Sequence, residues 1–439
     1  MPTAFTGKNY LDEVVRAQKS GQALGITSIC SSNRFVAQAS FLHALKNDLP
    51  ILIESTCNQV NQFGGYSGMT PDQFVAYINE IAGRVGIPWD RIILGGDHLG
   101  PYPWQNQSAS QAMEKARELV RDYVRVGYTK IHLDANMRCA DEDPARPLEK
   151  NISAQRAADL AWVAEAERKG LGLPQSGLRY VIGTEVPLPG GIQEREDSLA
   201  VTRTQDVEEA IELTREAFQE RGLEDAWERV MAVVVQPGVD FGDEALYEYD
   251  RQSASQLSRF IEKYDHLVYE AHSTDYQRQD SLKKLVEDHF AILKVGPALT
   301  YAFREALFAL AMMEEELFSG RPETQLSRLH QSLEKAMLEQ PAYWNAYYRG
   351  AEASQSFARK YSFSDRSRYY WTVPEVNRAI EKLLSNLSKT PPPLSLISQF
   401  LPPQYQRIRF GVLENTPQAL IIDKIDSVIS AYSFACGHI

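Results

Sequence analysis

The chain has 439 residues, of which 44% are hydrophobic and 24% charged, and its formal net charge is −12. This balance is typical of a globular protein with a large core. An acidic chain is a poor partner for nucleic acid or an anionic membrane, because both are bound by clustered basic residues. The four cysteines form no CxxC pair, and neither a signal peptide nor an apolar run of roughly 20 residues is present. We therefore expect a cytoplasmic protein.

Short apolar runs recur along the first three hundred residues, each followed by a polar cluster and an amphipathic stretch. Short runs rich in Val, Ile and Leu are typical of parallel strands that are buried on both faces. The eight runs are 24–30, 50–56, 91–98, 130–134, 180–186, 232–238, 267–273 and 292–300.

Helical patterns alternate with these runs. One of them opens with Thr70 as the cap and Pro71 at the first helical position. The others are 33–48, 110–126, 153–169, 206–221, 253–263, 280–289 and 301–318. Eight strands alternating with eight helices predict a (β/α)8 TIM barrel. The alternative is an open doubly wound sheet, and neither GxGxxG nor a P-loop supports it.

After about residue 320 the alternation stops, and the rest of the chain is mainly helical and rich in aromatic residues and proline. We predict a barrel over residues 1–320 that carries the active site. Residues 321–439 are predicted to form a helical extension packed on the barrel, as a lid or as a subunit interface. A homo-oligomer is expected.

The carboxyl ends of barrel strands carry the active site in this fold, and here those ends are unusually polar. Burying so many ionisable groups without a partner would be costly, and a bound divalent cation explains them. His98, Glu185 and His272 supply imidazole and carboxylate, which suit zinc, manganese or nickel, and Gln236 is a further, weaker ligand. His132 is predicted to support the site rather than to bind the metal.

Asp97, Asp134 and Glu270 are the candidate acid–base groups, because a carboxylate beside a cation can move a proton to or from a sugar hydroxyl. The alternative for each is to orient a metal-bound histidine. Lys294 raises a rival mechanism, since a lysine inside a barrel can form a Schiff base with a ketose. We favour an ion pair of Lys294 with Glu270 or Asp134.

Two segments are candidate covers for a substrate. Residues 58–68 contain amides, glycines and a tyrosine, and residues 362–371 contain two arginines that could hold a phosphate or bridge subunits. The helix that follows residues 296–298 is a possible anion site at its N-terminus. The predicted substrate-binding residues are Glu54, Asn61, Gln62, Lys294, Arg366 and Arg368.

Several long motifs occur in order over nearly the whole chain. They are NQFGGYSGM (61–69), LGGDHLGP (94–101), IGTEVPLPGG (182–191), VVVQPGVDFG (233–242), YEAHSTDYQ (269–277) and LKVGPALTYAFREALFAL (293–310). In these motifs the chain resembles the family of accessory, non-catalytic subunits of tagatose-bisphosphate aldolase, which is related to class II metal-dependent aldolases. The resemblance implies a zinc-binding role for His98 and a proton-handling role for Asp97. Gln236 stands where those aldolases have another histidine ligand.

The resemblance also implies C4 epimerisation of ketohexoses, such as fructose to tagatose. Because C4 is not adjacent to the carbonyl, simple deprotonation cannot invert it. Cleavage of the C3–C4 bond gives an enediolate and an aldehyde, and the aldehyde can rotate and add again. We therefore expect a metal-dependent 4-epimerase acting on a ketohexose or its phosphate. The alternatives are an accessory subunit of a tagatose-1,6-bisphosphate aldolase and, with no ATP-phosphate loop to support it, a tagatose 6-phosphate kinase.

Overall fold

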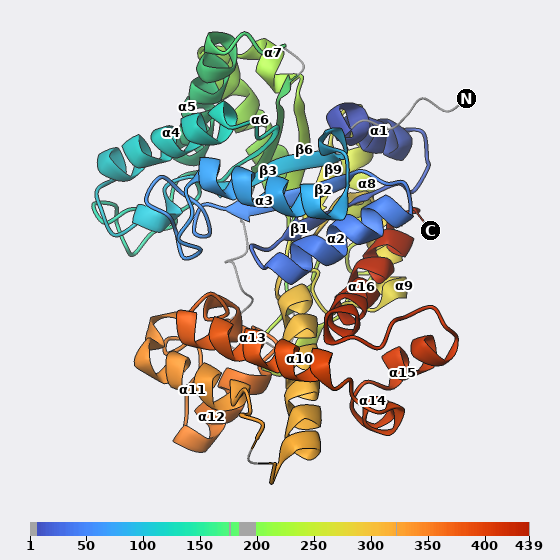
Figure 1. The fold of residues 1–439 in the computed structure, drawn as a ribbon. Coiled ribbons are helices and arrows are strands. Elements are labelled where there is room, and N and C mark those ends of the chain that lie inside the picture. Colours follow the sequence, from blue (N-terminus) through green and yellow to red (C-terminus); the bar gives the residue numbers. More distant parts are fainter. Residues whose placement is uncertain (1–6, 175–176, 184–198, 322, 439) are drawn as a thin grey trace.

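The computed structural model describes residues 7–174, 177–183, 199–321 and 323–438, and it contains a closed barrel of eight parallel strands (Figure 1). The strand order around the barrel is β1-β10-β9-β6-β5-β4-β3-β2. This confirms the predicted (β/α)8 fold. The strands are β1 (Ile26–Cys30), β2 (Ile51–Thr56), β3 (Ile92–Leu99), β4 (Lys130–Leu133), β5 (Arg179–Gly183), β6 (Val230–Val235), β9 (Val268–Ala271) and β10 (Phe290–Val295).

Seven helices follow the first seven barrel strands. α3 begins as predicted, with Pro71 in its first turn and the Gln73 side chain accepting from the Thr70 N–H at 3.0 Å. An unpredicted hairpin, β7 (Asp240–Phe241) and β8 (Leu246–Tyr247), follows β6. The seven helices are α2 (Arg34–Lys46), α3 (Pro71–Val85), α4 (Ala109–Arg125), α5 (Lys150–Gly170), α6 (Thr204–Glu220), α8 (Ser255–Phe260) and α9 (Gln279–Glu287).

The eighth place in the ring of helices is filled by the end of the chain. α10 (Pro297–Phe318) starts two residues after β10, whereas the eighth strand was predicted to run to residue 300. α10 then packs with α11 (Leu329–Glu339) and α13 (Pro374–Lys389). α16 (Pro417–Ala435) packs against both α9 and α2, and so lies between the seventh and the first helix of the ring (Figure 1). The predicted division at residue 320 remains a prediction.

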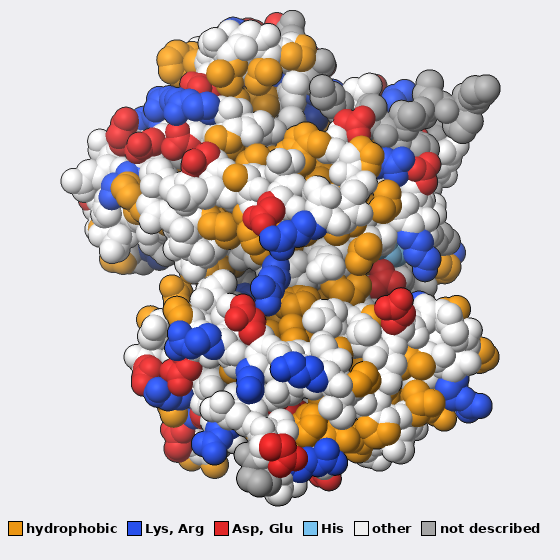
Figure 2. All heavy atoms as spheres, viewed as in Figure 1, with side chains coloured by type: hydrophobic (Ala, Val, Ile, Leu, Met, Phe, Trp, Pro, Cys, Tyr) orange, Lys and Arg blue, Asp and Glu red, His pale blue; other side chains and the backbone are white. Residues whose placement is uncertain are grey.

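The remaining helices of residues 323–438 lie beside the barrel, where α11 and α12 lie on one side of α10 and α13 crosses it (Figure 1). They include α12 (Glu352–Tyr361), the short η6 (Arg366–Tyr369), α14 (Leu394–Phe400) and α15 (Pro402–Arg409). Acidic and basic side chains are mixed over the face shown in Figure 2. None of the described helices combines the length and hydropathy that crossing a bilayer requires.

A helix that the sequence reading missed closes the amino end of the barrel. Tyr10, Leu11, Val14 and Val15 of α1 (Gly7–Lys19) pack in one cluster with apolar side chains of the barrel strands. We call this cluster the apolar layer. Its strand residues include Ile26, Leu52, Ile93, Val181, Val234, Val268 and Ile292.

Candidate active site

Two successive side chains of β3 reach the same cavity because the strand bulges. Gly96 pairs with Ile131 and Leu99 pairs with Leu133, so β3 holds one residue more than β4 over this stretch. His98 has a φ of +50°. Neighbouring residues in a regular strand point to opposite faces, and a bulge changes that alternation. Asp97 and His98 therefore both line the cavity, as the sequence predicted without the bulge.

Directly above the apolar layer lies a buried set of four charged side chains, which we call the charged layer: Glu54, Lys130, Glu270 and Lys294. Lys130 Nζ lies 2.6 Å from Glu54 Oε1 and 2.6 Å from Glu270 Oε2. Lys294 pairs with Glu54 and lies 2.9 Å from Asp97 Oδ1. Each ammonium group thus sits between carboxylates, which offsets part of the cost of removing these charges from water.

A glycine makes room for this layer. A Cβ on Gly95 of β3 would lie 2.6 Å from Cγ of Glu54. Because side chains two apart on a strand share a face, Leu52 and Glu54 of β2 contribute to successive layers of the interior. The same spacing places Val268, Glu270 and His272 one above another.

The charge on Lys294 bears on the Schiff-base alternative. Burial by itself would lower the pKa of the Lys294 ammonium group. Asp97 and the neighbouring carboxylates outweigh burial and raise this pKa well above its usual value. Schiff-base formation requires the neutral amine, so this environment favours the ion pair. Of the two predicted partners, Glu270 lies 3.7 Å away, whereas Asp134 pairs with His98 instead.

Three imidazoles meet at the top of the barrel. The ring centroids of His98, His132 and His272 lie 4.8, 5.2 and 5.3 Å apart. His98 Nδ1 lies 2.8 Å from Asp134 Oδ2, and its Nε2 lies 3.7 Å from Asp97 Oδ2. His272 Nε2 lies 3.0 Å from Glu270 Oε1.

His132 is fully buried against Asp97 and does not line the cavity. Its Nδ1 is 2.9 Å from Asp97 Oδ1, and its Nε2 is buried with no hydrogen-bond partner among the described residues. The sequence indicates this interior position of His132, because Lys130, His132 and Asp134 are two residues apart and so lie on the same face of one strand.

These groups fit a divalent cation. Asp97, His132, Glu270 and His272 each offer a ligand atom, and these atoms all lie within 4.8 Å of one another. The buried carboxylates of Asp97, Asp134, Glu54 and Glu270 face two ammonium groups, which leaves two negative charges when the imidazoles are neutral. A mixed nitrogen and oxygen set of this kind suits zinc and related first-row metals.

The pKa values of His272, His98 and Asp97 are shifted in different directions by their surroundings. Burial lowers the pKa of His272 to about 3, which keeps the imidazole neutral, as a metal ligand must be. For His98, burial lowers the pKa, but the Asp97 and Asp134 carboxylates outweigh it and raise the pKa. For Asp97, burial raises the pKa, but His98 and Lys294 together hold it well below its usual value, so Asp97 is ionised.

Other predicted ligands and acid–base groups lie outside the cavity lining. The side-chain oxygen of Gln236 accepts from the Gly238 N–H at 2.8 Å and the Val239 N–H at 3.0 Å, and so holds the turn after β6. Asp134 lies behind His98. Glu54 and Glu270 lie in the charged layer beneath the cavity. Glu185 falls outside the described residues.

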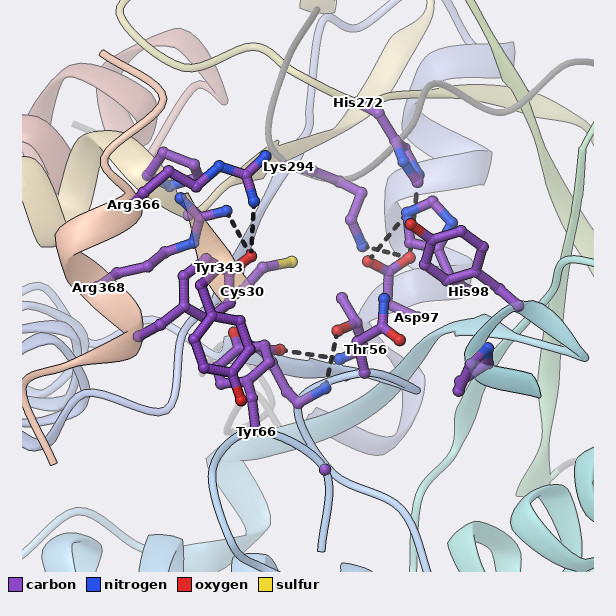
Figure 3. Close-up of a pocket in the computed structure, with 18 of the residues that line it drawn as sticks. Cys30, Thr56, Tyr66, Asp97, His98, His272, Lys294, Tyr343, Arg366 and Arg368 are labelled. Atoms are coloured by element: carbon purple, nitrogen blue, oxygen red, sulfur yellow. Dashed lines mark hydrogen bonds and ion pairs between the residues drawn. The ribbon is translucent and has the colours of Figure 1, made fainter. Parts of the chain in front are cut away.

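A cavity of about 530 Å³ opens between the mouth of the barrel and the helices beyond α10 (Figure 3). The predicted site residues in its lining are Asn61, Asp97, His98, His272, Lys294, Arg366 and Arg368. The lining also contains aromatic residues that were not among the predicted substrate-binding residues, although Tyr66 and Tyr369 lie in the two predicted covers. The others include Tyr102, Trp104, Tyr343 and Tyr347.

The two predicted amides of the 58–68 loop hold the loop itself. Asn61 Oδ1 accepts from the Phe63 N–H at 2.9 Å, and its Nδ2 donates to the Cys57 carbonyl at 2.8 Å. Gln62 donates to the Lys115 carbonyl of α4 at 3.0 Å and does not line the cavity.

Fold and site together define a (β/α)8-barrel protein with a buried cluster of possible ligands for a divalent metal. The model of the D-tagatose-1,6-bisphosphate aldolase subunit GatZ/KbaZ-like family matches residues 11–437, and the chain belongs to this family. The family description fits the expected accessory subunit more closely than the expected epimerase.

One solved structure agrees with this assignment over nearly the whole chain. A probable tagatose 6 phosphate kinase from Sinorhizobium meliloti 1021 is 43% identical, with a TM-score of 0.85 over 94% of this chain and 100% of that one. The YdjI aldolase from Escherichia coli K12 is 11% identical, with a TM-score of 0.39 over 85% of this chain and 94% of that one. The fructose-bisphosphate aldolase from Campylobacter jejuni is 12% identical, with a TM-score of 0.43 over 87% and 93%. These two aldolases are too distant to carry an argument.

Proposed function

We propose that this chain catalyses C4 epimerisation of a ketohexose or ketohexose phosphate by metal-dependent retro-aldol and aldol steps. The observation that supports it is the complete cluster of buried carboxylates, ammonium groups and imidazoles that opens into the cavity. Buried charges of this kind add little stability and are costly when any partner is missing. A chain that served only as a structural support would gain more from an apolar interior.

The metal would be held by the predicted ligands His98, Glu185 and His272. Of these, His272 belongs to the described group of ligand atoms within 4.8 Å of one another and His98 does not, and His132 of that group would join the predicted ligands. Gln236 would have to exchange its two backbone partners to take part. When bound, zinc, manganese or nickel polarises the ketose carbonyl and stabilises the negative charge that develops on cleavage. Asp134 fixes the ring of His98 through Nδ1, a common role for a carboxylate beside a metal ligand.

Asp97 is the proposed proton carrier. Its carboxylate accepts the O4 proton while the C3–C4 bond breaks, and the bond electrons pass to the enediolate. The aldehyde fragment then turns and is attacked by C3 on its other face, and Asp97 returns the proton to O4. Lys294, 2.9 Å away, keeps Asp97 ionised at the start of this cycle.

The test is incubation of the purified chain with manganese, zinc or nickel and either fructose or fructose 6-phosphate, with the products resolved by chromatography. We expect tagatose or its phosphate, and no deuterium at C3 or C4 when the reaction runs in D2O, because both carbon-bound hydrogens stay in place. Turnover that survives complete metal removal, or deuterium at C4, would contradict the mechanism.

A second candidate function is stabilisation of a separate aldolase subunit, which the family description favours. It predicts that the chain binds that subunit and has no turnover alone. Co-purification with Asp97→Asn separates the two functions, because a pure partner keeps its stabilising effect in this variant. The Sinorhizobium meliloti protein is described as a probable tagatose 6 phosphate kinase. A kinase function gains no support here, since the sequence of this chain contains no P-loop.

A further inference from the structure

One arginine in the cavity lacks the partners that a buried guanidinium needs. Arg366 is 3% exposed and lines the cavity. Its Nη1 donates to the Tyr369 hydroxyl at 3.4 Å, but Nε and Nη2 have no hydrogen-bond partner among the described residues. Leaving charged donors buried and unpaired is costly. Nε and Nη2 share one edge of the guanidinium, which is the fork that binds an oxyanion through two parallel N–H bonds.

The surrounding segment holds this arginine in place. The Tyr348 hydroxyl accepts from the backbone N–H of Arg366 at 3.1 Å, and the Arg366 guanidinium stacks on the ring of Tyr347. Arg368 is already engaged, since it donates to the Asp365 carbonyl and the Tyr369 hydroxyl, both at 3.0 Å. Figure 3 shows both arginines on one side of the cavity, with Lys294, Asp97, His98 and His272 on the other.

The place where (β/α)8 barrels commonly bind phosphate is filled by the chain itself. That site is formed by the loops after the seventh and eighth strands and a helix N-terminus. Here Asp275, from the loop after β9, accepts from the Gly296 N–H at 3.0 Å and the Ala298 N–H at 2.8 Å. Asp275 also lines the cavity. A phosphate at this position would have to displace a buried carboxylate and would meet its charge.

We infer that the substrate is a ketose with a single terminal anionic group, bound by the Arg366 fork, and that Asp275 excludes a second phosphate from the N-terminus of α10. This inference rests on the proposed function in one respect, which is that the substrate is a ketose. The shared chemistry is a terminal oxyanion, which a phosphate ester or a hexuronate carboxylate can supply. A ketose bisphosphate does not fit.

Calorimetric titration of the manganese-loaded chain tests this without requiring turnover. The ligands are fructose, fructose 6-phosphate, a ketohexuronate and fructose 1,6-bisphosphate. We expect at least one single-anion sugar to bind about tenfold or more tightly than fructose, and the bisphosphate to bind no more tightly than that sugar. If fructose 6-phosphate binds more tightly, the anion is a phosphate, and if the ketohexuronate binds more tightly, it is a carboxylate. Equal binding of fructose and both anionic sugars, or tighter binding of the bisphosphate, would overturn the inference.

Two variants sharpen the result. Arg366→Gln is expected to lose the preference for the anionic sugar by about tenfold while keeping its affinity for fructose, which also reports that the site is folded. Asp275→Asn keeps the oxygen acceptor but removes the charge, and is expected to raise the affinity for the bisphosphate. An unchanged preference in Arg366→Gln would overturn the anion site. If the binding pattern holds and no epimerisation occurs, the proposed function fails and the anion site stands.

Discussion

The apolar layer and the charged layer of this barrel are both buried, but they differ in what they contribute to stability and to chemistry. In the apolar layer, α1 seals the amino end with side chains such as Val14 against Leu52 and Ile93. Only two residues further along β2, Glu54 is as fully buried as Leu52 but is held between Lys130 and Lys294. Burial of apolar surface stabilises the fold. Burial of these charges stabilises it little, and they are positioned for chemistry.

The largest expected effect separates the chemistry from the fold. Asp97→Asn removes the proposed proton carrier and is expected to lower kcat by about 10²–10⁴-fold. The melting temperature should fall as well, because the amide removes the charge that faces Lys294, so kcat is compared per folded molecule. Ile93→Val, in the apolar layer, is the matched control and should leave kcat unchanged. A normal kcat in Asp97→Asn would remove this aspartate from the mechanism.

The next effect concerns the pairing within the charged layer. Lys130→Met leaves Glu54 and Glu270 buried without their shared cation, and is expected to cost about 3–5 kcal/mol in the free energy of unfolding, measured with denaturant. Adding Glu54→Gln and Glu270→Gln should recover part of this loss. If Lys130→Met is neutral, the three charges are not coupled as described.

A substitution that leaves an empty space in the apolar layer should lower the stability of the fold without changing catalysis. Leu52→Ala removes a fully buried side chain next to α1 and is expected to cost about 2–4 kcal/mol of unfolding free energy. Denaturant unfolding measures the loss, and kcat per folded molecule should equal that of the wild type. A fall in kcat would show that the two layers are mechanically linked.

A smaller effect is expected behind the metal ligands. Asp134→Asn removes the charge that fixes His98 through its Nδ1, and is expected to weaken metal binding by about 10–100-fold. Competition with a chelator measures the affinity. Asp288→Asn, on the outside of the barrel, is the control. Unchanged metal affinity would mean that His98 is oriented by other contacts or does not bind the metal.

The smallest expected effect lies at the amino end of the barrel. His438 Nε2 lies 2.7 Å from the Tyr10 hydroxyl and 3.0 Å from the Gly25 carbonyl. Burial lowers the pKa of His438 to about 4 from the usual 6.5. The folded state therefore prefers the neutral ring, so this stability is present above pH 6.5 and is lost as the pH falls towards 4.

His438→Gln tests this, because glutamine can keep a hydrogen bond but does not titrate. Between pH 6.5 and 4 the variant should lose about 1–2 kcal/mol less unfolding free energy than the wild type. Thermal unfolding at a series of pH values measures the difference. Parallel curves for the two proteins would show that His438 does not contribute to the acid sensitivity.

The strand ends and their polar residues could be read from the sequence because parallel strands buried on both faces form short apolar runs, and the same face recurs every second residue. This located Asp97, His98, His272 and Lys294 at one cavity. His132, predicted to support the site, lies 2.9 Å from Asp97 and does not line the cavity.

Contacts between distant segments could not be read in the same way. Nothing local in residues 417–435 indicates that α16 takes the eighth place in the ring, and nothing in α1 indicates that it seals the barrel. The same holds for Gln236, whose amide is used by its own turn. Arg366 was predicted to bind substrate and does line the cavity, but the sequence did not indicate which of its donors have no partner among the described residues.

The sequence by itself thus determined the class of fold and which strands carry the chemistry, since both follow from periodicity and from the rule that barrel sites lie at strand ends. Only the tertiary structure decided which charges pair, which helix N-terminus is already filled by Asp275, and which guanidinium is left with free donors. Those outcomes depend on distances between side chains far apart in the chain, and such distances have no local signal.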